Sequence, residues 1–111
     1  ALKSPLNRAE YILNLEGINP FDEKDTSMDS NFLLSQIELR EDLEGIKEQK
    51  DSLALDDFID RIKLFIKDNV SSISDAFTNL WDLKLATELV RELKFYEQLN
   101  TDANSLMDEW L

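Results

Sequence analysis

Apolar residues recur at helical spacing in long segments of the chain. The most regular segment extends from Leu55 to Phe77, where aliphatic and aromatic residues follow one another at intervals of four or three positions, the spacing that places them on one face of a helix. A similar stripe extends from Leu85 to Met107. No segment is a convincing strand, and the chain has only 2 glycines and 2 prolines for tight turns. The pattern therefore predicts an all-α fold.

A short helix is predicted at the amino-terminal end. Ser4 is suited to cap it and Pro5 to occupy its first position, where a missing N–H is tolerated. The helix is expected to extend to about Glu16, because Gly17 readily adopts the left-handed conformation that ends helices. Its apolar residues point in nearly every direction, which is typical of a helix buried on two sides. They are Leu6, Ala9, Tyr11, Ile12, Leu13 and Leu15.

Capping residues also predict the limits of three longer helices. Thr26 and Asp29 have the spacing of a capping box, and the helix that follows them is expected to extend to about Lys50. A weak break at 51–52 precedes the third helix, and Asn79 is the expected N-cap of the last. Three long helices joined by short breaks predict an antiparallel three-helix bundle. The expected domain organisation is a short helix at 1–17, a linker at 18–28 and the bundle at 29–111.

The second helix contains more apolar residues than one buried stripe requires. At about 100° per residue, its core stripe is expected to lie within about 40° of Phe32. Leu33, Leu34 and Ile37 fall instead at about 100°, 200° and 140°, on the side away from that core. The core stripe itself comprises Phe32, Gln36, Leu39, Leu43 and Ile46.

Acidic residues continue this second face toward the carboxyl end of the helix. An apolar patch rimmed by charge is typical of a protein-binding surface, so partner binding is one interpretation. The alternative is that Leu33 and Ile37 pack against the short helix and that the acids form a solvated face. A catalytic role for Glu38 or Glu41 is not favoured, because no apolar pocket or second functional group is evident to activate either carboxylate. The acids of this face are Glu38, Glu41, Glu44 and Glu48.

The last predicted helix contains one aromatic residue at the border of its apolar stripe and two at its ends. Phe95 lies at the border of the apolar stripe, about 240° from Leu89, a position that suits either core packing or partner contact. Trp81 and Trp110 stand at the two ends of the predicted helix, where both are expected to close the bundle.

Composition and charge restrict the possible functions. The chain of 111 residues has 12 Lys and Arg against 24 Asp and Glu, a net charge of −12, which disfavours nucleic acid and anionic membranes and favours a basic partner. It contains no Cys and no His, so no metal or cofactor is predicted, and catalysis would have to use carboxylates alone. No apolar run approaches the ~20 residues that span a bilayer, and the start ALKSPLNRAEY lacks a signal-peptide region. A soluble, cytoplasmic protein that is not an enzyme is therefore expected.

Three separated blocks, SPLNRAEYIL, NFLLSQIELREDLEGI and VRELKFYEQL, resemble the carboxyl-terminal part of the HscB-type co-chaperones of iron–sulfur cluster assembly. The resemblance implies that the bundle binds an IscU-type scaffold protein, while a J domain stimulates a DnaK-like ATPase of the HscA type. The short helix would then be the remnant of the last helix of a missing J domain. The chain contains no histidine, so the His-Pro-Asp motif of the J domain is absent from it and ATPase stimulation is not expected. The residues that match the family's J-domain motif are Pro5, Leu6, Arg8, Ala9, Glu10 and Tyr11.

The resemblance also assigns residues to the scaffold-binding surface. The family's aliphatic contacts match the three residues that the helical wheel places on the second face, and its acids and its aromatic contact follow at the same spacing. One family acid corresponds to Gly45, which removes a charge and costs about 1 kcal/mol relative to alanine inside a helix. Two other functions remain compatible with the pattern: a homodimer seam in an acidic adaptor module, and an enzyme that relies on carboxylates. The predicted scaffold-binding residues are Leu33, Leu34, Ile37, Glu38, Glu41 and Phe95.

Overall fold

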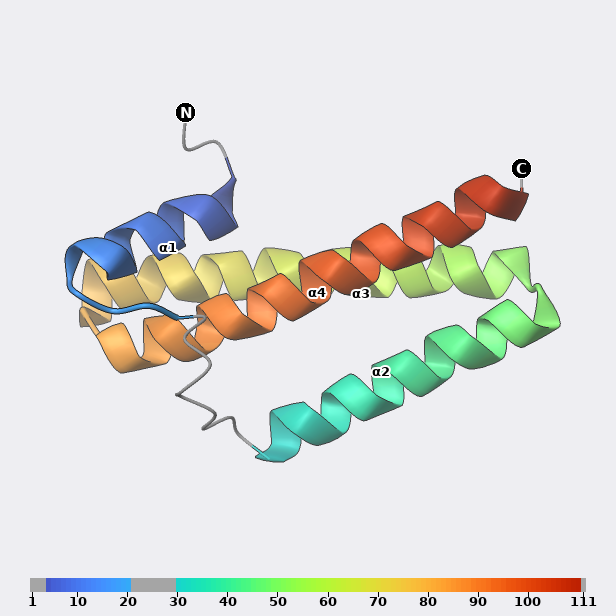
Figure 1. The fold of residues 1–111 in the computed structure, drawn as a ribbon, viewed down its shortest axis with the longest axis horizontal. Helices are drawn as coiled ribbons and strands as arrows, with labels where there is room; N and C mark the ends of the chain where they lie inside the picture. The colour runs from blue at the N-terminus through green and yellow to red at the C-terminus, as the bar shows by residue number, and fades with distance from the viewer. Residues whose placement is uncertain (1–3, 21–29, 111) are drawn as a thin grey trace. The chain divides into compact units, whose positions relative to one another are not determined.

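The computed structural model describes residues 4–20 and 30–110, and its regular segments are helices (Figure 1). No strand is present in these residues, and the predicted all-α class is confirmed. The predicted capping box, Thr26 and Asp29, lies outside the described residues. The elements are α1 (Pro5–Leu15), α2 (Ser30–Gln49), α3 (Ser52–Asp75), the short π-helical turn η1 (Ala76–Leu80) and α4 (Leu83–Trp110).

The ends of α1 are formed by the residues that the sequence predicts. The Ser4 side chain caps the helix and accepts a hydrogen bond from the Asn7 amide at 3.5 Å. After the helix, Gly17 adopts a left-handed φ of 79°. The Ile18 amide then donates to the Leu13 carbonyl oxygen at 2.9 Å, and the Glu16 amide donates to the same oxygen at 3.0 Å, which closes the last turn of the helix.

The expectation that α1 is buried on two sides is wrong for this chain. Ala9 and Leu13 are buried, whereas the side chains of Tyr11 and Leu15 are 50% and 67% exposed. One face of the helix therefore packs against other residues and the opposite face is open.

The connection between α3 and α4 differs from the prediction at Asn79. This residue does not cap the last helix; it lies in η1, and its side-chain amide donates to the Asp75 carboxylate. The chain reverses at Trp81, which has a left-handed φ of 47°. Asp82 follows and accepts a hydrogen bond from the Leu85 amide at 3.1 Å. Asp82 is therefore the N-cap, because the π-helical turn continues α3 past the predicted starting point of α4.

Replacing Asp82 with alanine is expected to lower the free energy of unfolding by about 1 kcal/mol, since the first turn of α4 loses a capped amide. The matched variant Asn79→Ala should cost less than about 0.5 kcal/mol, as is usual for exposed surface positions. Urea denaturation followed by circular dichroism measures both changes. A larger loss for Asn79→Ala than for Asp82→Ala would contradict this assignment of the cap.

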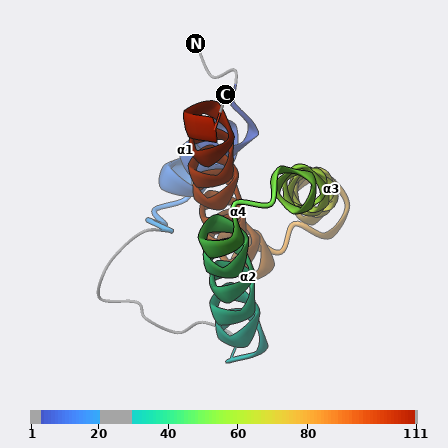
Figure 2. The ribbon, with the colours of Figure 1, turned by 90° about the vertical axis from the view of Figure 1, so that its right-hand side faces the viewer.

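The chain divides into two compact units. Of the described residues, the first unit contains 4–20 and 67–94, and the second contains 30–66 and 95–110. In the second unit, α2 and α3 run in opposite directions and α4 returns in the direction of α2 (Figure 1). Figure 2 views this unit nearly along its helices, with the turn from α2 to α3 toward the viewer. These three segments form the predicted antiparallel bundle.

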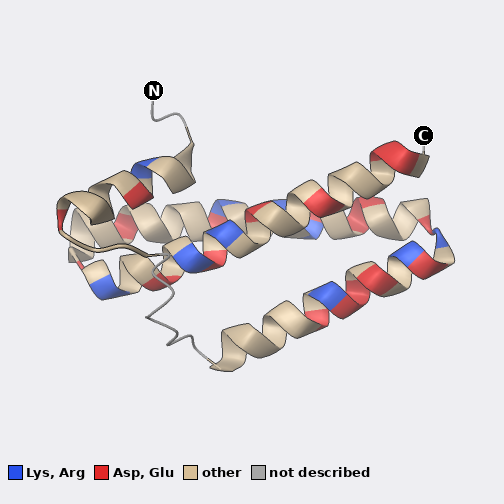
Figure 3. Cartoon of the chain, in the orientation of Figure 1, with Lys and Arg blue, Asp and Glu red and all other residues tan. Residues whose placement is uncertain are grey.

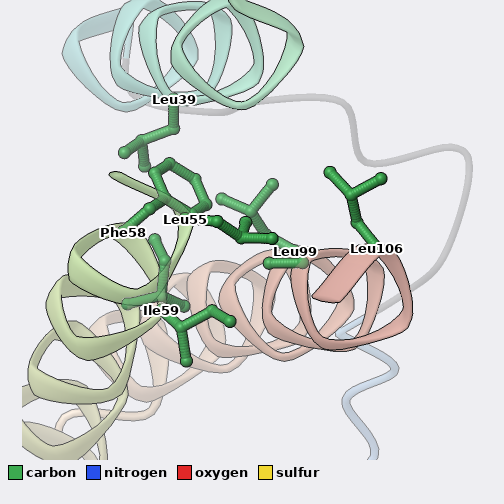
Figure 4. Close-up of a cluster of buried hydrophobic side chains, with 8 residues drawn as sticks. Leu39, Leu55, Phe58, Ile59, Leu99 and Leu106 are labelled. Atoms are coloured by element: carbon green, nitrogen blue, oxygen red, sulfur yellow. The ribbon is translucent and has the colours of Figure 1, made fainter. Parts of the chain in front are cut away.

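The core of the second unit combines side chains from all three helices. Leu39 of α2 points toward Phe58 and Leu55 of α3 and toward Leu99 of α4 (Figure 4). The predicted stripe of α2 is largely confirmed, because Phe32 and Leu39 are buried while others on it are partly buried against the cluster. The buried cluster consists of Leu39, Leu55, Phe58, Ile59, Ile62, Leu99, Ala103 and Leu106.

The first unit has a smaller apolar core of its own. The Arg91 Nε donates to the Pro20 carbonyl oxygen at 2.6 Å and ties the residues after α1 to α4. The buried apolar side chains of this unit are Ala9, Leu13, Ile73, Ala76, Ala86, Val90 and Leu93.

The two tryptophans have different environments. Trp110 is partly buried against the core cluster of the second unit, as expected for a residue that closes a bundle. Trp81 is 55% exposed, and its ring lies 6.3 Å from the ring of Phe77. The expectation that Trp81 closes the bundle is therefore wrong, because the left-handed turn at this residue leaves most of its side chain in solvent.

Candidate protein-binding surface

The outer side of α2 carries three exposed aliphatic side chains, which together form the apolar patch: Leu33, Leu34 and Ile37. Their exposed fractions are 43%, 58% and 54%. Phe32 and Leu39 of the same helix are buried, so the core of the unit is filled from the opposite side of α2. The patch residues are therefore not part of the core of this unit. Clustered exposed aliphatics of this kind mark surfaces on which other molecules dock.

Four exposed glutamates continue the outer side of α2 toward its carboxyl end. Figure 3 shows the first turns of the helix without charge and the later turns rich in acidic and basic residues. The ion pairs of α2 lie on its two flanks, where Arg40 contacts Asp102 at 3.0 Å and Asp42 contacts Arg61 at 3.4 Å. Within the described part of the chain, the four glutamates have no ion pair. This acidic row consists of Glu38, Glu41, Glu44 and Glu48.

Phe95 of α4 is half-buried at the edge of α2. Its ring centroid lies 5.8 Å from that of Phe32 at an interplanar angle of 89° and 5.7 Å from that of Tyr96. Edge-to-face pairs of this kind are worth about 0.5–1.5 kcal/mol beyond the area that they bury. The guanidinium of Arg40 lies over the same ring, 5.5 Å from its centroid. Phe95 is thus packed, as its border position in the stripe suggests, and also partly exposed.

The structure brings the predicted binding residues of α2 onto one side and places Phe95 on the neighbouring helix. Leu33 and Arg40 lie on the same flank of α2, about two turns apart, and Arg40 contacts Phe95. This flank therefore links the apolar patch to Phe95. Gly45 lies inside α2, and apart from its chain neighbours and the adjacent backbone of the helix, a Cβ at this position would meet no atom within 4 Å. Packing therefore does not require a glycine where the family pattern has an acid.

Sequence reasoning missed Arg40 and Asp102. The two residues are far apart in the chain, and their contact follows from the register of α2 against α4, which periodicity does not specify. The available signal was weak: Arg40 interrupts an otherwise acidic segment, at the border between the predicted core and the second face.

Burial raises the pKa of the Glu97 carboxyl above its usual range. Glu97 lines a shallow hollow with Lys63 and Asn100. On α4 it lies about 160° around the helix from Phe95. The carboxyl with the raised pKa therefore lies on the opposite side of α4 and is not part of the candidate surface.

The described residues contain no group of three or more acidic side chains arranged to hold a metal ion. Within residues 4–20 and 30–110, no helix combines the length and the apolar character needed to cross a bilayer.

Comparison with known proteins identifies the family. Residues 28–104 match the family described as the HSCB C-terminal oligomerisation domain. The structure is similar to that of the chaperone HscB from Vibrio cholerae, with a TM-score of 0.82 and 31% sequence identity over 99% of this chain. The chain spans 63% of the length of that protein. The resemblance seen in the sequence is thus confirmed, and the chain belongs to the family of HscB carboxyl-terminal oligomerisation domains.

Proposed function

We propose that this chain is the scaffold-binding part of an HscB-type co-chaperone of iron–sulfur cluster assembly. It would hold an IscU-type scaffold protein on α2 and Phe95 for delivery to an HscA-type DnaK-like chaperone. The observation that carries the proposal is the exposed apolar patch beside an acidic row on a helix whose opposite side already fills the core. Contact with the DnaK-like chaperone is assigned to a J domain, and a cytoplasmic location is part of the proposal.

The mechanism is binding, with no covalent step. Full burial of an aliphatic side chain contributes about 1.5–3 kcal/mol, and the patch residues are already about half-buried. Covering the rest of the three side chains therefore contributes on the order of 2–4 kcal/mol, before the costs of association. Phe95 adds an aromatic contact, and the acidic row favours a partner with basic residues.

Isothermal titration of the chain with a cluster-free IscU-type scaffold from the same organism tests the proposal. A complex of one chain with one scaffold is expected. Absence of binding at concentrations of both proteins up to about 100 μM, which corresponds to a binding free energy of about −5.5 kcal/mol, would overturn the proposal.

Neutralising two glutamates of the acidic row should slow the association. Steering by complementary charge mainly raises the association rate and weakens with salt. The double variant Glu38→Gln/Glu41→Gln is therefore expected to associate about three- to tenfold more slowly at low ionic strength, with a smaller change in the dissociation rate. Stopped-flow kinetics over a series of salt concentrations measures both rates.

A matched control removes two exposed carboxylates of α3, in the variant Asp56→Asn/Asp60→Asn. It has the same net charge as the α2 variant but keeps the acidic row intact. Equal slowing in both variants would show that total charge, and not the acidic row, governs association.

A second candidate function is self-association through the apolar patch. It is favoured by the family's description as an oligomerisation domain. Light scattering separates the two candidates: a mass that stays monomeric over the concentrations used for titration excludes the dimer. A dimer that dissociates on changing Ile37 to Glu would support it.

A further inference from the structure

Arg40 contacts two side chains of α4 on the flank between α2 and α4. Its Nη1 donates to the Asp102 Oδ2 at 3.0 Å, and its guanidinium lies over the Phe95 ring at 5.5 Å from the centroid. Asp102 is itself held from the other side, because the Gln98 Nε2 donates to its Oδ1 at 3.1 Å. Both oxygens of the carboxylate are therefore engaged. The arrangement holds the guanidinium over the ring.

The exposure of this cluster indicates that folding does not depend on it. The side chains of Arg40 and Asp102 are 47% and 40% exposed, and exposed ion pairs contribute little to stability. The buried core of the unit forms beneath them from other residues. The contacts of Arg40 thus act mainly on Phe95, whose inner side is already packed by Phe32 and Tyr96.

We propose that Arg40 is a positioning residue for partner binding, anchored by Asp102 so that it holds the Phe95 ring in its binding orientation. This inference rests on the proposed function. An aromatic ring that is already fixed loses less conformational freedom when the partner docks, so that more of the contact energy appears as affinity. The neutralising carboxylate has a second effect: it offsets a positive charge that would otherwise repel a basic partner at the edge of the apolar patch.

Arginine is required by this geometry. A planar guanidinium can stack on a ring and donate to a carboxylate at the same time, whereas the ammonium of lysine is a compact charge without a plane. Arg40→Lys therefore keeps the charge and removes the planar group that lies over the ring. Binding by this variant therefore distinguishes positioning of the Phe95 ring from an effect of the positive charge alone.

A double-mutant cycle of Arg40 and Phe95 tests the inference, with the cluster-free IscU-type scaffold as the titrant. Arg40→Gln is expected to weaken binding about three- to tenfold, and Arg40→Lys should lose most of the same affinity. In the background of Phe95→Ala, the further change Arg40→Gln should alter Kd by less than about twofold, because the ring that it positions is gone. In the free chain, the Phe95 ring proton resonances should shift in both Arg40 variants.

The opposite flank of α2 offers a closely matched control. The guanidinium of Arg61 lies over the Phe58 ring at 5.4 Å and contacts Asp42 at 3.4 Å, but the Phe58 ring is buried and only 1% exposed. Arg61→Gln removes the same types of contact without freeing an exposed ring. It should leave Kd unchanged within about twofold.

Three results would overturn the inference while the proposed function stands, provided that the wild-type chain binds. They are an effect of Arg40→Gln that is fully retained in the Phe95→Ala background, wild-type affinity in Arg40→Lys, and an equal loss of affinity in Arg61→Gln. The first would show direct contact of Arg40 with the partner, the second a role of charge alone. A wild-type chain that binds no scaffold would instead overturn the proposed function and the inference together.

Discussion

Replacing Leu33, Leu34 and Ile37 together with alanine is expected to abolish scaffold binding and to leave the fold intact. The partner loses the aliphatic surface that contributes on the order of 2–4 kcal/mol, so Kd should rise by about 30-fold to 900-fold. The three side chains are 43%, 58% and 54% exposed, so the free energy of unfolding should fall by only about 1–3 kcal/mol: their half-buried surface is lost, and alanine, a good helix former, offsets part of the loss. Titration calorimetry and urea denaturation of the same preparation measure the two quantities.

Leu53 and Leu64 of α3 provide the matched control, with exposed fractions of 79% and 61%. The double variant Leu53→Ala/Leu64→Ala removes comparable aliphatic surface from another helix and should bind with the wild-type affinity. Unfolding of the triple variant, or loss of binding in the control, would contradict the assignment of the patch to partner binding.

Phe58→Ala is expected to destabilise the chain by about 3–5 kcal/mol, the usual cost of removing a buried phenylalanine ring. Phe58 is 1% exposed and belongs to the cluster that α2, α3 and α4 share in the second unit. The midpoint of urea unfolding, followed by circular dichroism, reports the change.

Phe65→Ala is the corresponding control on the same helix. Its ring is 39% exposed and lies 5.6 Å from the ring of Tyr96, so its loss should cost about 1 kcal/mol. If the two variants were equally destabilised, the distinction between the buried cluster and the exposed side of α3 would not hold.

The core and the apolar patch were predictable because both follow from helical periodicity. Phe32 and Leu39 repeat at the spacing of one face, and Leu33, Leu34 and Ile37 are left on the other. The sequence also placed Gly17 correctly, since a glycine there suits the left-handed end of α1. Each of these inferences depends on residues close together in the chain.

The remaining features depend on how distant residues meet or on the path of the backbone. Asn79 and Asp82 are both good caps, and the choice between them is made by the π-helical turn and the left-handed Trp81. The contact of Arg40 with Asp102 requires the register between α2 and α4. The binding role of the patch stays a prediction until a partner is titrated.

The open space around Gly45 gives experimental access to the surface of α2. The chain has no cysteine, so Gly45→Cys would introduce a single thiol that maleimide dyes label at one defined place. A Cβ there meets no atom within 4 Å, and the loss of a mid-helix glycine favours the helix. A fluorophore at this position would lie beside the acidic row, and its emission would be expected to change when the partner protein binds.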